Sequence, residues 1–231
     1  DEGTEAVLAA LRADSLDTER GIHVGWGSLR NLDIVAAWRA PYALVFDVSP
    51  HQLAMWRACA RVLQDAESPP DFAAALAATL PDAPRPRRFT DDLHTWIAAD
   101  LARPGSWLAD DDAFDHVRSL ALDDAIGFGV LDLFGPEPPF DALAHRIDEA
   151  GLHVGTIYAS NLPWLAERPR GMFGDALPAD APKRIARNLA RLGPDDTPVV
   201  VAERLVPGSD HDDPWFVTER ISLGAFARSR S

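Results

Sequence analysis

Short apolar runs alternate with amphipathic helical segments along this chain, and this alternation constrains the fold more than any other feature of the sequence. Residues 42–46, Tyr-Ala-Leu-Val-Phe, are continuously apolar and are followed directly by Asp47, a pattern typical of a strand buried on both faces of a parallel sheet. Similar patterns predict strands at 21–26, 42–46, 125–133, 152–159 and 198–202, and helices at 4–13, 30–39, 140–151 and 182–192. The alternation predicts the α/β class, with an open, mainly parallel sheet and helices on both faces.

Residues 50–124 interrupt this alternation with Ala- and Leu-rich helical segments, which are broken by a proline- and arginine-rich stretch at 81–88. No flexible Gly/Ser linker bounds the region, as would be expected between independent domains. We therefore predict a single domain over residues 1–231, with residues 50–124 as a helical insertion after the second strand.

The charge balance limits the partners of the chain. It carries 36 Asp and Glu against 22 Lys and Arg, a net charge of −14, which repels a phosphate backbone. Lys183 is the only lysine, so the sequence has no polybasic patch for an anionic membrane surface. We expect a small-molecule substrate, without a nucleic-acid or membrane partner, and make no prediction of the oligomeric state.

Cys59 is the only cysteine, which excludes an internal disulfide or a multi-cysteine metal site and favours a reducing compartment. No apolar run approaches the ~18 to 20 residues that a membrane-spanning helix needs, and no secretion signal opens the chain. These features predict a cytoplasmic protein without a metal site. Because the numbering begins at Asp1 and not at Met, removal of a leader stays open.

Glycines and a carboxylate follow the first two predicted strands. Gly25 and Gly27 would let the backbone pass close to a ligand, and Asp47 stands 20 positions after Gly27. That spacing suits a carboxylate that accepts hydrogen bonds from a ribose diol. Separately, the glycine pair and the acid are more often structural, but together and in this order they favour a nucleoside-type ligand.

Arg30 bears on the kind of nucleoside. It occupies the position at which a dinucleotide-binding fingerprint has its third glycine, and a large side chain there would obstruct close packing of the helix. This disfavours a nicotinamide or flavin dinucleotide. A nucleoside without a pyrophosphate, such as S-adenosylmethionine, does not need that tight turn.

Polar side chains also follow the later strands. Asp132 could accept from an adenine amino group beside an apolar wall at Leu133, or it could cap a turn. After the fourth strand, the carbonyl oxygen of Asn161, next to Ser160, could hold an acceptor nucleophile while Tyr158 packs against the substrate. A capping role for Ser160 or Asn161 is the alternative.

Several of these segments together resemble a family of bacterial proteins with the class I S-adenosylmethionine-dependent methyltransferase fold, much of which has no established substrate. The segments are Gly25-x-Gly27-x-x-x-Asn31, Arg39-Ala40-Pro41, Val45-Phe46-Asp47 and Thr156-Ile157-Tyr158-Ala159-Ser160-Asn161. The resemblance covers most of residues 20–60 and 125–205. Residues 160–164, Ser-Asn-Leu-Pro-Trp, also look like a variant of the motif with which many amino-methylating enzymes hold their target nitrogen.

The resemblance implies a Rossmann-like sheet that binds S-adenosylmethionine, with the helical insertion covering the mouth of the pocket. The residues that would hold the cofactor are Gly25, Trp26, Gly27, Asn31, Asp47, Val48, Asp132, Leu133 and Tyr158, and those at the reacting methyl group are Ser160 and Asn161. Methyl transfer from a sulfonium depends mainly on alignment and exclusion of water, so the resemblance requires no dedicated base.

Two positions depart from common methyltransferases, which have an acidic residue at the position of His23 and a third glycine at that of Leu29. These departures favour the alternative of a non-catalytic module that binds a small molecule or acts as a scaffold. A Rossmann-type oxidoreductase is a second alternative, and Arg30 argues against it.

Other candidate residues have simpler interpretations. Residues 210–213, Asp-His-Asp-Asp, could bind a hard cation but are more typical of a solvated loop. His23 and His51 could act as bases, or could donate and accept hydrogen bonds in a pocket wall. Among the tryptophans, we expect Trp56 and Trp96 in the core and Trp26, Trp107 and Trp164 at loop edges, where they could line a pocket.

Overall fold

The fold is described from a computed structural model, which covers residues 4–14, 19–27, 29–79, 100–166, 177–204 and 216–230. Within these ranges, the side chains of residues 51, 164, 165, 203, 204, 216 and 217 are not described. The proline- and arginine-rich stretch at 81–88, Trp96, the cluster at 210–213, and the side chains of His51 and Trp164 therefore lie outside the described residues.

Six strands form one open sheet in the order β3-β2-β1-β4-β5-β6. They are β1 (Gly21–Trp26), β2 (Tyr42–Phe46), β3 (Ile126–Gly129), β4 (His153–Ser160), β5 (Pro198–Arg204) and β6 (Phe216–Ser222). Neighbours from β3 to β5 are parallel, whereas β6 runs antiparallel to β5 at the edge. This arrangement confirms the predicted Rossmann-like, mainly parallel sheet, and its order reverses between β1 and β4.

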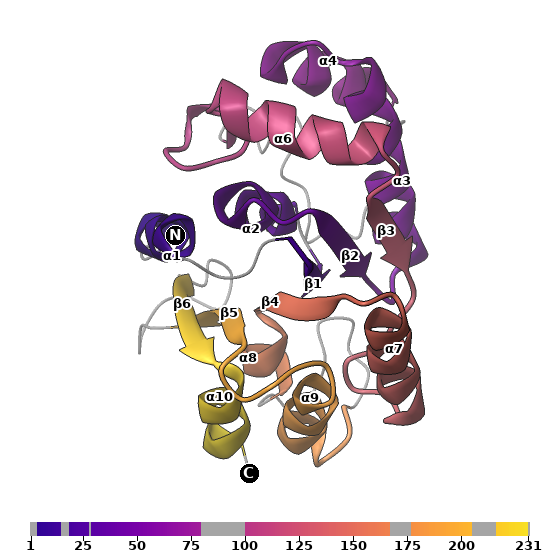
Figure 1. The fold of residues 1–231 in the computed structure, drawn as a ribbon, viewed down its shortest axis with the longest axis vertical. Coiled ribbons are helices and arrows are strands. Elements are labelled where there is room, and N and C mark those ends of the chain that lie inside the picture. Colours follow the sequence, from indigo (N-terminus) through magenta and orange to yellow (C-terminus); the bar gives the residue numbers. More distant parts are fainter. Residues whose placement is uncertain are drawn as a thin grey trace.

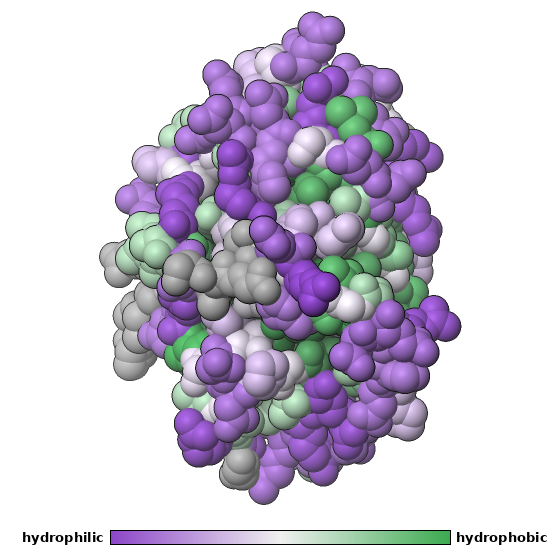
Figure 2. Space-filling view, viewed as in Figure 1, coloured by the Kyte–Doolittle hydropathy of each residue, from purple (hydrophilic) through white to green (hydrophobic). Residues whose placement is uncertain are grey.

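Helices cover both faces of the sheet (Figure 1). One layer contains α1 (Thr4–Ala13), α2 (Arg30–Trp38), α3 (Pro50–Asp65) and α6 (Asp111–Leu122), and the other contains α7 (Pro138–Glu149), α8 (Leu162–Ala166), α9 (Ala181–Ala190) and α10 (Leu223–Ser229). The two faces bury separate hydrophobic clusters. In the view of Figure 2, hydrophilic residues cover most of the outer helices, and apolar residues show mainly in the middle, between the layers.

The described helices between β2 and β3 pack together on the first of these layers. Helix α3 lies against β3, where Trp56 stacks on Phe128 with ring centroids 5.5 Å apart. Beyond it, α4 (Pro69–Thr79) and α6 enclose a cluster of buried aromatic rings from Phe72, Trp107 and Phe114. Trp107 lies in a loop before α6, as predicted, but its side chain is 1% exposed in this cluster and does not line an open pocket as we expected.

A buried carboxylate in α2 fixes the loop before α6. Asp33 accepts hydrogen bonds from the backbone N–H of Trp107 at 3.0 Å and from Nη2 of Arg103 at 2.6 Å. The described helices α4 and α6 therefore extend the helical layer outward from α2 and α3 (Figure 1).

The predicted elements differ from the structure mainly at the end of β3 and near the carboxyl terminus of the chain. We expected strand β3 to continue to residue 133, but it ends at Gly129. The chain turns at 132–135, where the Gly135 N–H donates to the Asp132 carbonyl oxygen. Strand β6 and helix α10 were not predicted. In β6, buried Thr218 is followed by exposed Glu219, so this edge strand lacks the continuous apolar run of the central strands.

Candidate functional site

The carboxyl ends of β1, β2 and β3 lie side by side and continue the sheet by one residue. The N–H of Gly27 donates to the Phe46 carbonyl oxygen at 3.2 Å, and the N–H of Asp47 donates to that of Gly129, also at 3.2 Å. These bonds place Gly27, Asp47 and the residue after Gly129 along one edge, where open α/β sheets bind their ligands.

Strand β4 brings two further residues to this edge at the point where the strand order reverses. Gly27 has φ +84° and Ser160 has φ +53°, and a Cβ on Gly27 would lie 3.4 Å from the Ser160 Oγ. A left-handed conformation is unfavourable for serine and is often found at ligand sites. The Ser160 hydroxyl donates to the Asn161 Oδ1 at 3.4 Å, so both predicted reaction-site residues lie beside the Gly27 turn.

Helix α3 holds the Gly27 turn from the other side. The Gly27 carbonyl oxygen accepts hydrogen bonds from Trp56 Nε1 at 2.9 Å and from Gln52 Nε2 at 3.2 Å. Since the Gly27 N–H is also bonded within the sheet, this residue offers a ligand close approach to the backbone and not a hydrogen bond.

Asp47 carries the carboxylate of the edge. Its Oδ1 accepts the Ser49 N–H at 2.7 Å, and Ser49 in turn caps α3. Partial burial raises the pKa of Asp47, while the backbone N–H groups of Ser49 and Val48 act in the opposite direction. Among the described residues, no side chain pairs with this carboxylate, so it can accept further hydrogen bonds.

Two valines at the same edge are exposed. Val48, next to Asp47, is 54% exposed, and Val130, directly after β3, is 71% exposed. Few large apolar side chains of the described residues are exposed to this degree. The ends of β2 and β3 therefore offer a carboxylate flanked by apolar surface, a combination suited to a ribose and a base.

Asp132 lies in the turn after β3. Its Oδ1 accepts the Phe134 N–H at 2.9 Å, which is the turn-capping role considered above. Helix α9 fixes the same turn, because Asn188 Nδ2 donates to the carbonyl oxygens of Leu133 and Gly135 at 2.9 and 3.1 Å.

Some predicted site residues have buried side chains. Trp26 is 2% exposed, lies between Phe46 and Phe140, and donates from Nε1 to the Leu131 carbonyl oxygen at 2.9 Å. Leu133 is also 2% exposed. Trp26 is the last residue of β1, as predicted, but its side chain points into the core between the sheet and α7, where we expected it to line a pocket.

Asn31 belongs to a polar cluster in the protein interior. Its Oδ1 lies 3.0 Å from His23 Nε2, His23 Nδ1 lies 2.8 Å from Thr156 Oγ1, and Asn31 Nδ2 donates to the Trp26 carbonyl oxygen at 3.3 Å. All three side chains are 0% exposed. Burial lowers the pKa of His23 to about 4, against the raising effect of the bond to Asn31, so His23 is neutral at pH 7. We expected His23 near a pocket, as a base or as a hydrogen-bonding wall residue, and did not predict its place in this buried cluster.

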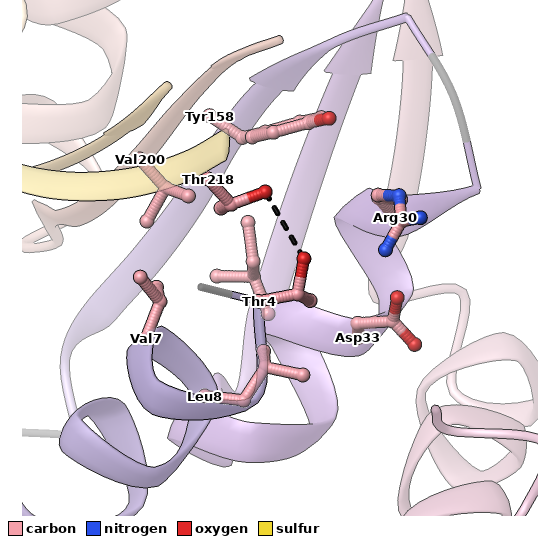
Figure 3. A pocket seen from close by; sticks show the side chains of 9 residues that line it. Thr4, Val7, Leu8, Arg30, Asp33, Tyr158, Val200 and Thr218 are labelled. Carbon is pink, nitrogen blue, oxygen red and sulfur yellow. Dashed lines mark hydrogen bonds between the residues drawn. The ribbon is translucent and has the colours of Figure 1, made fainter. Parts of the chain in front are cut away.

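A small pocket lies on the α1 and α2 face of the sheet, between these helices and strands β4 to β6 (Figure 3). Tyr158 and Arg30 are among its lining residues, and a hydrogen bond of 3.0 Å joins the hydroxyls of Thr4 and Thr218 at its wall. Of the predicted site residues, Tyr158 lines this pocket. Gly27, Asp47 and Asn161 do not.

Within the described ranges, no group of three or more His, Cys, Asp or Glu side chains is placed to hold a metal ion. In the same ranges, no helix combines the length and apolar character needed to cross a membrane.

Comparison with known proteins identifies the family of the chain. Residues 7–83 and 88–168 match the family described as "Domain of unknown function (DUF7790)". The chain belongs to this family. No curated protein matches the chain.

Solved structures similar to the chain include two of an rRNA methyltransferase, aviRa, from Streptomyces viridochromogenes. Both are 14% identical in sequence, and each alignment covers 99% of this chain and 88% of the other, with TM-scores of 0.46 and 0.45. These similarities concern the overall fold alone.

Proposed function

We propose that this protein binds S-adenosylmethionine at the carboxyl edge of its sheet and transfers the methyl group to a small-molecule acceptor. The observation that carries the proposal is the meeting of Gly27, Asp47 and Ser160 at one edge, from segments far apart in the sequence. This is the edge at which the strand order reverses and ligands of such sheets bind.

The side chains at this edge fit an adenosine-bearing ligand. The Asp47 carboxylate has accepting capacity for a ribose diol, and the exposed Val48 and Val130 supply apolar surface for the base. Gly27 lets the ligand approach the backbone closely. In this proposal Asp132 reaches the adenine through the carboxylate oxygen that does not cap its turn, while Gly25, Trp26, Asn31 and Leu133 support the site from within.

The chemistry needs alignment more than acid–base groups. When bound, S-adenosylmethionine supplies a methyl group already activated by a sulfonium. The Asn161 Oδ1 would orient the acceptor by accepting its proton-bearing group, and Ser160 would hold that amide in place through its hydroxyl. Tyr158, which is 3% exposed and lies two residues before Ser160 in β4, would support the acceptor side from within the protein. No described residue is assigned as a general base.

A binding assay with S-adenosylhomocysteine tests the first half of the proposal, because this product analogue binds without turnover. Calorimetric titration should give saturable binding in the wild type and clearly weaker binding in Asp47→Ala. Asp65→Ala is the matched control, since Asp65 is exposed at the end of α3. NAD in place of the analogue tests the oxidoreductase alternative. Absence of S-adenosylhomocysteine binding by the folded wild type would overturn the cofactor assignment.

The second half is tested by transfer of a labelled methyl group into a small-molecule extract and, separately, into RNA. Label in the small-molecule fraction supports the proposed acceptor class, and label in RNA alone would contradict it. The neutral, buried His23 at a position that is acidic in common methyltransferases favours a second candidate, a non-catalytic binding module. That candidate predicts binding of the nucleoside without any transfer.

A further inference from the structure

Three buried polar side chains connect the central strands β1 and β4, between which the strand order reverses, to the first turn of α2. Thr156 comes from β4, His23 from β1 and Asn31 from α2, and each is 0% exposed. The contacts run in one line, from Thr156 Oγ1 to His23 Nδ1 at 2.8 Å and from His23 Nε2 to Asn31 Oδ1 at 3.0 Å. The line ends at the Trp26 carbonyl oxygen, which accepts from Asn31 Nδ2 at 3.3 Å.

The chemistry of Asn31 determines the tautomer of His23. Because Nδ2 of Asn31 donates to a backbone carbonyl, the oxygen of the same amide faces His23 and can only accept. The proton of the neutral imidazole is therefore on Nε2, and Nδ1 accepts from the Thr156 hydroxyl. Every donor then points along the line toward Trp26.

The last acceptor belongs to the peptide unit that begins the Gly27 turn. The Trp26 carbonyl and the Gly27 N–H are parts of the same planar peptide group. Asn31 bonds the carbonyl, and the N–H donates to the Phe46 carbonyl oxygen at 3.2 Å. The orientation of this plane is thus fixed at both ends, and Asn31 controls one of them.

Gly25 makes room for this line of contacts. A Cβ at Gly25 would lie 1.7 Å from Asn31 Oδ1 and 2.9 Å from His23 Nε2, separations that no relaxation of a buried amide accommodates easily. The φ of Gly25 is not in the left-handed region. The requirement for glycine at this position therefore comes from the buried side chains and not from a turn or an external ligand.

We propose that Thr156, His23 and Asn31 form a positioning relay that orients the Trp26–Gly27 peptide group for the ligand edge, with His23 held as the neutral Nε2–H tautomer. This inference deepens the proposed function and rests on it for the identity of the ligand. None of the three residues touches the ligand. Thr156 acts through His23, His23 through Asn31, and Asn31 through the backbone of the Gly27 turn.

Nitrogen-15 NMR of the wild-type imidazole tests the relay without any ligand. The expected result is the Nε2–H tautomer of His23, unchanged between pH 6 and pH 8. Finding the Nδ1–H tautomer or a charged ring would overturn the proposal, since the line of donors would then be broken at its centre.

Substitutions at Thr156 test what the relay does. Thr156→Val removes the hydroxyl at nearly constant volume, and Thr156→Ser retains it. The control is Thr218→Val, which removes another buried hydroxyl, bonded to Thr4 outside the relay. Amide hydrogen exchange at Gly27 should become about tenfold faster in Thr156→Val, and stay near the wild-type rate in Thr156→Ser and Thr218→Val.

Affinity for S-adenosylhomocysteine should follow the same order, with a fivefold to tenfold weaker Kd in Thr156→Val and recovery in Thr156→Ser. If Thr156→Val lowers the melting temperature as Thr218→Val does, with Gly27 exchange unchanged, the three residues are only structural and the relay is wrong. If the wild type binds no S-adenosylhomocysteine, the proposed function fails, while the tautomer and the exchange rates still decide the relay. If Thr156→Val does not fold, Thr156→Ser and the wild-type tautomer decide whether the relay exists. A Gly27 exchange rate in Thr156→Ser far from that of the wild type would then contradict the relay.

Discussion

The two halves of the carboxyl edge differ in where their side chains point. At the ends of β2 and β3, Asp47 is partly exposed and Val48 and Val130 are largely exposed. In the inner half, formed by β1 and β4, the polar side chains of His23 and Thr156 lie completely buried within the strands and bond to other parts of the protein. Ser160 and Asn161, at the end of β4, are partly exposed. The outer half, at the ends of β2 and β3, offers a ligand a carboxylate and apolar side chains, whereas the inner half offers Ser160 and Asn161 on a backbone that buried polar side chains hold in place.

This difference follows from position in the sheet. Strands β1 and β4 are central and covered by helices on both faces, so a polar side chain there needs a partner within the protein. Strand β3 is at the edge of the sheet and β2 is its neighbour, so the residues after them remain accessible. Substitutions of the buried residues of the inner half should therefore change stability and the order of the backbone, and affect binding only through them, whereas substitutions in the outer half should change binding directly.

The largest effect is expected at Gly25, in the inner half. A Cβ there would lie 1.7 Å from Asn31 Oδ1, so Gly25→Ala should displace a buried amide and lower the free energy of unfolding by about 3 kcal/mol or more. Gly151→Ala is the comparison, because its Cβ would meet nothing within 4 Å and only the φ of +71° opposes it. Its expected cost is about 1 kcal/mol. Urea unfolding measures both, and equal losses would contradict the crowding at Gly25.

The acid sensitivity of the inner half should come from His23. Burial lowers its pKa from 6.5 to about 4, so between these pH values the unfolded state binds the additional proton and the folded state does not. The stability associated with this group is complete above pH 6.5 and falls by about 3 kcal/mol as the pH drops to 4.

Urea unfolding at pH 7, 6, 5 and 4, for the wild type and for His23→Gln, measures this contribution. Glutamine takes up no proton in this range, and the carboxylates titrate in both proteins, so the difference between the two curves isolates His23. The wild type should lose more stability over the window. If the stabilities of the wild type and His23→Gln fall in parallel with pH, the His23 imidazole is already protonated in the folded protein.

The two halves also differ in how much of their structure could be predicted from the sequence. The continuous apolar run at 42–46 and the glycines at 25 and 27 were enough to place strands β1 and β2 correctly and to bring Asp47 to the edge. The inward orientation of Trp26 and Asn31 was not predictable, because it depends on strand register and helix rotation, and a shift of one residue in a strand reverses the face of every side chain. Strand β6 has charged residues within it, so no apolar pattern marked it.

In the outer half, Asp47→Ala should have the largest effect on binding. Loss of a carboxylate that accepts hydrogen bonds from a ribose diol is expected to weaken S-adenosylhomocysteine binding by about 2 kcal/mol, which is more than tenfold in Kd. Stability should change little at pH 7, because burial of this carboxylate is itself unfavourable, as its raised pKa indicates. Calorimetry and urea unfolding of the same samples separate the two effects. A large loss of stability with unchanged Kd would assign Asp47 to the fold.

The smallest expected effect is at Val48, and it distinguishes apolar contact with a base from simple exposure. Val48 is 54% exposed in the free protein, so Val48→Ala removes little buried surface and should leave the free energy of unfolding within ~0.5 kcal/mol of wild type. If an adenine covers this side chain, the lost contact should weaken nucleoside binding by about 0.5 to 1 kcal/mol. Leu122→Ala is the matched control, because Leu122 is 51% exposed at the end of α6, away from the carboxyl edge, and its loss should leave Kd unchanged. Equal Kd values for both variants and the wild type would remove the Val48 side chain from the binding surface and would leave ligand contact to the ends of β1 and β4.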